Sequence, residues 1–264
     1  MDSFSMTIRQ KWLGQPASAQ GVVPATAGRL VRPEGGTYLN RAELQPNTAT
    51  ADVAVVALLK DAMWRAGQWV NGTTTFTDDT QDAQDADTND FALETTTAAD
   101  GFIVGANDKF GAISLDVTTA GVGATAHVIE YWDGAAWTAI AAAGMLVDIP
   151  GRAGVIAAGE QLVMFISPVN WEKGGSGTGT PQNTYNVRIR ATTGTITTAA
   201  LARRIYVGRI LMSVANLAIN GSYERAFPNP IYLSGAVYAA IGAAFDAANE
   251  GNAFFAEVSD GTPF

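Results

Sequence analysis

Few side chains in this 264-residue chain have the type and spacing that chemistry requires. Cysteine is absent, and the only histidine, His127, stands next to no serine or carboxylate motif in the apolar run ATAHVIEYW. The stretch GGSGTGT at 174–180 lacks the Lys-Ser/Thr ending of a phosphate-binding loop. No motif marks a pair of acids for glycoside hydrolysis. We therefore expect a packed or surface strand histidine, a flexible glycine loop and no catalytic residues.

The acidic stretch FTDDTQDAQDADTND at 76–90 is the one candidate metal site. Asp85, Asp87 and Asn89 alternate as the first ligands of a calcium loop do. The sixth position, however, is an aspartate instead of glycine, and the twelfth is Thr96 instead of a bidentate glutamate. The sequence favours a solvated acidic loop, so neither a metal nor a cofactor is predicted.

The aromatic stretch EYWDGAAWTAI at 130–140 has two interpretations. Trp132 and Trp137 flank an Asp-Gly dipeptide, which is typical of a tight hairpin turn, and would form a cross-strand pair. Neighbours on a strand point to opposite faces, so Tyr131 and Trp132 cannot share a platform. The hairpin interpretation is favoured. The alternative is a carbohydrate-binding platform made of Trp132, Trp137 and Trp171.

Composition limits the classes of function. Hydrophobic residues make up 47% of the chain, which is enough for a core without disulfides. The net charge of -9 argues against binding to nucleic acid, which needs clustered bases. No apolar run resembles a signal-peptide core or reaches the roughly 18 residues that span a bilayer. We therefore expect no membrane association, and we expect the protein to be synthesised in the cytoplasm.

Charge is distributed unevenly along the chain. Residues 61–100 contain nine acids and one base, Arg65, whereas the first 60 residues contain six bases and four acids. The nine acids are Asp61, Asp78, Asp79, Asp82, Asp85, Asp87, Asp90, Glu94 and Asp100.

Short strand-like runs dominate from residue 101 onwards. Eight of them, rich in Val, Ile, Thr, Tyr and Phe, are separated by Gly, Asn, Asp and Thr clusters. Alternation is clearest in Tyr185, Val187 and Ile189, whose intervening neighbours are polar. This spacing predicts a mainly β protein with a β-sandwich or jelly-roll-like domain.

The two ends of the chain are harder to interpret. Four prolines punctuate the first fifty residues, which favours an extended N-terminal arm that needs a partner surface. The block DVAVVALLKDAMWRAG at 52–67 could be a helix or a buried strand followed by a turn. The last fifty residues could likewise be helical or form a hairpin around NEGN.

We expect four segments along the chain: an extended arm at 1–50, a linking segment with the acidic loop at 51–95, the β-sandwich at 96–212, and a C-terminal β-rich or mixed segment at 213–264 that packs on the sandwich.

Residues 96–206 resemble a β-sandwich module that recurs in structural proteins of tailed bacteriophages. The resemblance lies in a Phe-led strand KFGAISLDVTT, the hairpin EYWDGAAW, the strand end PVNW and the strand YNVRIRATT. This chain departs from the module at Asn170, where Asp is usual, and at Asn186, where an aromatic is usual. The resemblance implies a non-enzymatic virion component, most like a capsid decoration or cement protein. A tail or head-fibre receptor module that binds carbohydrate is the alternative.

The same resemblance implies how the protein attaches. It predicts a homotrimer on the capsid surface, with the N-terminal arm lying across the major capsid protein and neighbouring subunits. The slight positive charge of the arm would complement an acidic shell. The side chains expected to make this contact are Arg9, Lys11, Trp12, Leu13, Arg29, Leu30, Arg32, Tyr38 and Arg41.

Overall fold

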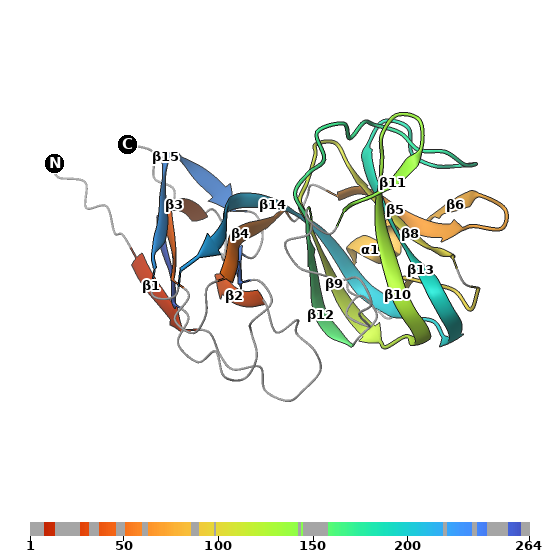
Figure 1. The fold of residues 1–264 in the computed structure, drawn as a ribbon, viewed down its shortest axis with the longest axis horizontal. Helices are drawn as coiled ribbons and strands as arrows, with labels where there is room; N and C mark the ends of the chain where they lie inside the picture. The colour runs from red at the N-terminus through yellow and green to blue at the C-terminus, as the bar shows by residue number, and fades with distance from the viewer. Residues whose placement is uncertain are drawn as a thin grey trace. The chain divides into compact units, whose positions relative to one another are not determined.

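The protein is mainly β, as the sequence predicts, and contains one short helix among the residues that the structure describes (Figure 1). The structure is a computed structural model. It describes residues 8–13, 27–31, 37–45, 51–59, 63–85, 90–97, 99–141, 144, 158–218, 221–233, 237–241 and 253–259. No helix within these ranges is long and apolar enough to cross a bilayer.

The chain divides into two compact units. The larger unit is built mainly from Asp61–Gly208, and the smaller unit combines Met1–Gln20 and Ala25–Lys60 with Arg209–Phe264. The long strand β14 (Leu201–Leu217) begins in the larger unit and ends in the smaller.

Two antiparallel sheets form the larger unit. The first has the strand order β11-β10-β13-β8-β5-β6, and the second contains β12, β9 and β14 with the short strand β7 at its side. The bounds in the first sheet are β11 (Trp137–Ala139), β10 (Val122–Trp132), β13 (Tyr185–Thr198), β8 (Gly101–Ala106), β5 (Met63–Val70) and β6 (Thr75–Asp78). Those in the second are β12 (Gly159–Met164), β9 (Ala112–Thr119) and β7 (Phe91–Ala92); the helix α1 spans Thr80–Gln84.

The core of the larger unit lies between these two sheets. Val187 and Ile189 of β13 are fully buried in one cluster with Ile113 and Leu115 of β9. Both pairs follow the period of two that places alternate side chains of a strand on one face. This packing of two antiparallel sheets confirms the predicted β-sandwich.

The smaller unit joins the two ends of the chain. Its first sheet has the order β1-β17-β3-β15, and β4, β16 and β2 are neighbours in a second. The bounds are β1 (Ile8–Leu13), β2 (Ala27–Val31), β3 (Thr37–Gln45), β4 (Ala51–Leu59), β15 (Tyr223–Leu233), β16 (Val237–Ile241) and β17 (Ala253–Ser259).

These pairings answer the questions that the sequence left open at the chain ends. The block at 52–67 forms strands, because it contributes all but the first residue of β4 and the start of β5. The last fifty residues contain strands β16 and β17, whereas the segment between them lies outside the described residues. The described residues among the first fifty form strands β1, β2 and β3, which pair with β17, β16 and β15 of the same chain.

The predicted capsid-contact residues lie mostly in these N-terminal strands. Arg9, Lys11, Trp12 and Leu13 are in β1, Arg29 and Leu30 are in β2, and Tyr38 and Arg41 are in β3. Arg32 lies outside the described residues.

Candidate functional site

The β10–β11 hairpin carries two tryptophans on the outer face of the first sheet, away from the sandwich core. Trp132 and Trp137 are paired in register, with ring centroids 5.7 Å apart in an edge-to-face arrangement. Tyr131 points the other way and is buried in the sandwich core. The structure therefore confirms the predicted hairpin with its cross-strand aromatic pair.

A third tryptophan and an arginine join this pair from distant strands. Trp69 of β5 lies with its ring centroid 6.5 Å from that of Trp137. The guanidinium carbon of Arg188, on β13, is 5.1 Å from the Trp69 centroid and 4.7 Å from the Trp137 centroid. Contacts of this kind between a cation and indole faces are attractive. We call Trp69, Trp132, Trp137, Arg188 and Glu130 the tryptophan–arginine cluster.

Glu130 supplies the negative charge of the cluster. Its carboxylate accepts a hydrogen bond from Arg188 Nε at 2.8 Å and two from Arg190, from Nε and Nη2, each at 2.9 Å. Burial lowers the pKa of Arg188 from its ordinary value, and the charge of Glu130 opposes that shift. The cluster holds Glu130 as a counter-ion, with both of its oxygens already accepting hydrogen bonds.

The glycine-rich stretch 174–180 covers the cluster, and we call it the glycine roof. A Cβ atom on Gly177 would lie 2.5 Å from the Trp69 ring, and one on Gly175 would lie 3.0 Å from the Trp137 ring. The roof is also bonded to the β5–β6 hairpin, because Thr178 N donates to Thr74 O at 2.9 Å. The sequence predicted a flexible loop here, whereas the structure uses glycine for close approach to the indoles.

Replacing Gly177 with alanine should therefore destabilise the larger unit by about 1–3 kcal/mol, the usual cost of overpacking. Gly177 has φ +108°, which L side chains rarely adopt, and its new Cβ would also meet Thr74 O at 2.6 Å. The measurement is denaturant unfolding followed by tryptophan fluorescence. Gly72→Ala is the matched control, since nothing lies within 4 Å of its Cβ position. Equal stability of the two variants would contradict a docked roof.

Trp171 is separate from this cluster. It is only 2% exposed, and its indole N–H donates to Asn186 O at 3.1 Å. Its ring centroid is 5.0 Å from that of Phe110 and 5.7 Å from that of Tyr185. Trp171 thus belongs to the sandwich core, so the three tryptophans of the alternative carbohydrate platform are not brought together. Trp132 and Trp137 remain half-buried on the outer face.

The two asparagines that depart from the phage module both have defined partners. Asn170 Oδ1 accepts a hydrogen bond from the Tyr131 hydroxyl at 2.9 Å. Asn186 is fully buried, and its amide nitrogen donates to Gly174 O at 2.8 Å and Pro181 O at 2.7 Å. Asn186 therefore binds the first residue of the glycine roof and the residue that follows it to β13.

His127 has a carboxylate partner that its sequence neighbourhood did not reveal. Its Nε2 lies 3.3 Å from Glu94 Oε2, and the other Glu94 oxygen accepts a hydrogen bond from Ala200 N at 3.3 Å. Both side chains are buried. The histidine is packed, as expected, but the pairing joins residues 33 positions apart, which no local motif could have indicated.

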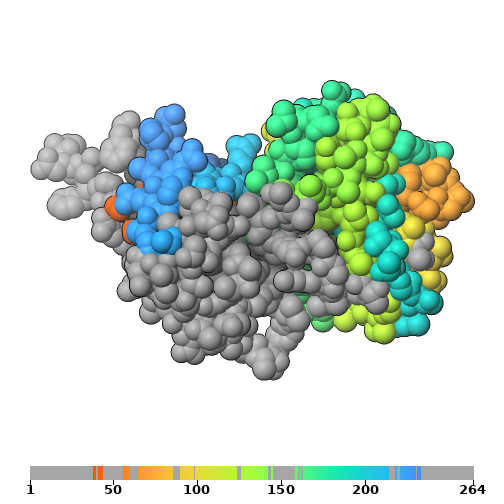
Figure 2. Space-filling model, in the orientation of Figure 1, coloured from red at the N-terminus to blue at the C-terminus, as the bar shows by residue number. Residues whose placement is uncertain are grey.

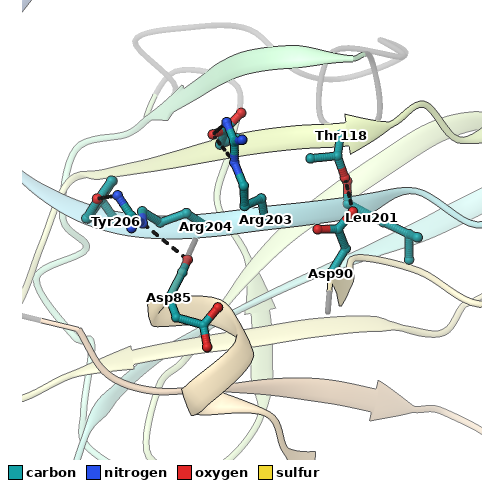
Figure 3. A network of polar contacts seen from close by, with 8 residues as sticks. Asp85, Asp90, Thr118, Leu201, Arg203, Arg204 and Tyr206 are labelled. Atoms are coloured by element: carbon teal, nitrogen blue, oxygen red, sulfur yellow. Dashed lines mark hydrogen bonds and ion pairs between the residues drawn. The ribbon is translucent and has the colours of Figure 1, made fainter. Parts of the chain in front are cut away.

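Arg204 of β14 and Thr118 of β9 hold the acidic stretch in place (Figure 3). Arg204 Nε donates to the main-chain oxygen of Asp85 at 3.2 Å, and its Nη1 donates to the Tyr206 hydroxyl at 2.7 Å. Farther along, Thr118 donates both to Asp90 and to Leu201 O. The described part of the stretch thus contains most of strand β6 and all of helix α1, and Arg204 binds its Asp85 to β14.

The alternating ligands of the possible calcium loop lie mostly outside the described residues. Asp87 and Asn89 lie outside the described residues, and within the described ranges no three His, Cys, Asp or Glu side chains group to hold a metal. Burial raises the pKa of Asp79, and the charges of Asp82 and Asp78 add to the shift.

Two of the predicted capsid-contact residues have partners within the chain. Tyr38 packs edge-on against Tyr232 with ring centroids 5.3 Å apart. Arg41 forms an ion pair with Glu224 and lies 3.6 Å from Glu43. The positive charge of Arg41 is therefore largely compensated inside the smaller unit.

Comparison with known proteins finds no match for this chain among protein-family models, curated proteins or solved structures.

Proposed function

We propose that the chain is a non-enzymatic component of a tailed-bacteriophage particle, a decoration or cement protein that binds and stabilises the capsid shell. The observation that carries this proposal is that buried charged side chains of the sandwich are paired with other groups of the same chain. Glu130 is neutralised by Arg188 and Arg190, and Glu94 is occupied by His127 and a backbone N–H. Charged groups that are paired within the fold stabilise it, as expected of a structural protein. This observation agrees with the resemblance of 96–206 to the phage module.

The proposed partner is the major capsid protein, bound by a homotrimer of this chain on the outer capsid surface. The N-terminal strands bring Arg9, Lys11 and Arg29 into the smaller unit, where their charge would complement an acidic shell. A ring of identical subunits matches the repeated symmetric sites of a capsid. The acidic stretch of the larger unit would then face solvent and oppose aggregation of particles.

A carbohydrate-binding receptor module of the tail or head fibre is the second candidate. The observation that favours it is the placement of Trp132 and Trp137 on the outer face of the hairpin, where neither ring is fully buried. Figure 2 shows the hairpin (lime green) on the surface of the larger unit. Addition of sugars would quench tryptophan fluorescence in this case, and replacement of Trp132 would abolish the effect.

Copy number in purified particles is the test that separates these functions. Quantitative mass spectrometry should find the chain in hundreds of copies if it decorates the shell, because each symmetric site repeats over the capsid. A few copies to a few dozen would place it in the tail or fibre instead. Absence from the particle would show that the proposed function is wrong.

The attachment surface needs a test that keeps the fold. Removing residues 1–50 would delete β1, β2 and β3, which pair with β15, β16 and β17, so neutralising charges is cleaner. The variant replaces Arg9, Lys11 and Arg29 of the smaller unit with glutamine. The control replaces three exposed bases of the larger unit, Arg65, Lys173 and Arg203. Loss of capsid occupancy in the first variant alone supports the proposal, and equal occupancy contradicts it.

A further inference from the structure

Strands β5 and β6 are joined by a turn (Figure 1). This turn contains an exposed Asn-Gly dipeptide. Asn71 and Gly72 are both exposed, and apart from Gly72 and its two chain neighbours no residue has an atom within 4 Å of the position that a Gly72 Cβ would take. The main chain of Asn71 is held, since its N–H donates to Asp100 Oδ1 at 2.7 Å. Its side-chain amide has no hydrogen-bond partner among the described residues. Figure 2 shows this hairpin (orange) at the surface.

We propose that Asn71-Gly72 is a site of spontaneous covalent modification, at which Asn71 loses ammonia and becomes aspartate or isoaspartate. The main-chain nitrogen of Gly72 gives up its proton and attacks Asn71 Cγ, forming a five-membered succinimide. The Cγ–Nδ2 bond breaks, and the leaving nitrogen departs as ammonia with that proton. Water then opens the ring at either carbonyl, which yields aspartate or isoaspartate without any oxidant or enzyme.

The absence of a side chain on Gly72 is what makes this attack accessible. A Cβ on the residue that follows asparagine hinders approach of its nitrogen to Cγ, and glycine has none. Gly72 also lies beyond Val70 and Thr75, the last pair of the β5–β6 ladder, so strand pairing does not fix its attacking nitrogen. Both conditions are met at this exposed turn and not inside β5 or β6.

Two Asp-Gly dipeptides that lie wholly within the described residues, Asp100-Gly101 and Asp133-Gly134, are protected by the fold. The remaining Asn-Gly and Asp-Gly dipeptides, at 220–221 and 260–261, include residues outside the described ranges. The Asp133 carboxylate accepts hydrogen bonds from Ala135 N, Ala136 N and the Thr138 hydroxyl at 2.7–2.9 Å. The Ala136 N–H is the largest cause that lowers the pKa of Asp133, so this side chain stays ionised and is a poor electrophile. Asp100, which precedes Gly101, is buried and accepts a bond from Thr95 at 2.6 Å.

Isoaspartate at position 71 would disturb the glycine roof. It inserts a methylene into the main chain and removes the carbonyl position at which Asn71 O accepts Thr74 N at 3.3 Å. Thr74 O is in turn the acceptor for Thr178 N of the roof. The modification therefore loosens the contact that holds the roof over Trp69, whereas simple aspartate adds a charge and leaves the main chain intact.

The experiment ages the full-length protein at mildly alkaline pH and maps its peptides by mass spectrometry with a fragmentation method that separates aspartate from isoaspartate. Both products are expected at residue 71, whereas Asp100 and Asp133 should show no isoaspartate. Gly72→Ala should slow the reaction severalfold and leave the fold unchanged, because the turn has space for the methyl group. An intact Asn71 in the native protein, alongside modification of the urea-unfolded chain, would overturn the proposal.

A second measurement tests the link to the roof. The aged protein is separated by ion exchange, and the isoaspartate fraction is compared with an Asn71→Asp variant that carries the same charge on an unaltered main chain. Faster proteolysis within 174–180 is expected in the isoaspartate fraction alone. Equal resistance in both would show that modification of the turn does not reach the roof.

Discussion

Replacing Glu130 with glutamine is expected to lower the free energy of unfolding by about 3–5 kcal/mol, the cost of removing one partner from a buried ion pair. The substitution keeps the volume of the side chain but leaves Arg188, whose side chain is 9% exposed, without its counter-ion. Arg190 would then repel Arg188 without an anion between them. Denaturant unfolding followed by circular dichroism measures the loss.

Asp116→Asn is the matched control for that change. Asp116 also forms an ion pair with an arginine, Arg203, at 2.6 Å, but these side chains are 38% and 46% exposed, respectively. Exposed pairs of this kind contribute little because solvent screens them. We expect no change in unfolding beyond experimental error. If Glu130→Gln also left the free energy of unfolding unchanged, the tryptophan–arginine cluster would not contribute to the stability of the sandwich.

Replacing Trp171 with alanine is expected to cost about 3–5 kcal/mol, which is typical of removing a buried tryptophan. The change would empty a site in contact with Phe110, Phe165 and Tyr185 and leave Asn186 O without its donor. Thermal unfolding should show a lower transition temperature, because the loss falls in the core of the larger unit.

Val169→Ala serves as the control, only two residues away. The side chain of Val169 is 98% exposed, so its truncation should leave stability unchanged. Trp171→Phe adds a finer comparison, because it keeps an aromatic ring and loses only the N–H and part of the volume. A stable Trp171→Ala variant would contradict a core role and reopen its assignment to a carbohydrate platform.

Local signals in the sequence were sufficient for the strands of the sandwich and for its hairpin. The alternation of apolar and polar side chains in YNVRIRATT depends only on which face of one strand is buried, and this stretch forms the first part of β13. The Asp-Gly turn with its flanking tryptophans is likewise contained within ten residues, and its register was predictable. The block at 52–67 remained ambiguous because a short apolar run fits both a buried strand and a helix.

The candidate site was predicted only in part. Trp132 and Trp137 were identified, but Trp69 and Arg188 were not, because β5 and β13 meet the hairpin only through the order of strands in the sheet. The same holds for Glu94, which reaches His127 across a long separation in the chain. Long-range pairing leaves no period or motif in a single sequence.

Sequence alone thus determined the mainly β class, the sandwich strands and the hairpin, because burial on one face imposes a period of two within each strand. Tertiary structure decided what those strands bring together. It placed glycines against indoles in the roof, gave Glu130 two arginines, and paired the N-terminal strands with the C-terminal ones. These contacts depend on strand order and close approach between distant segments, which are properties of the folded chain and of no local stretch within it.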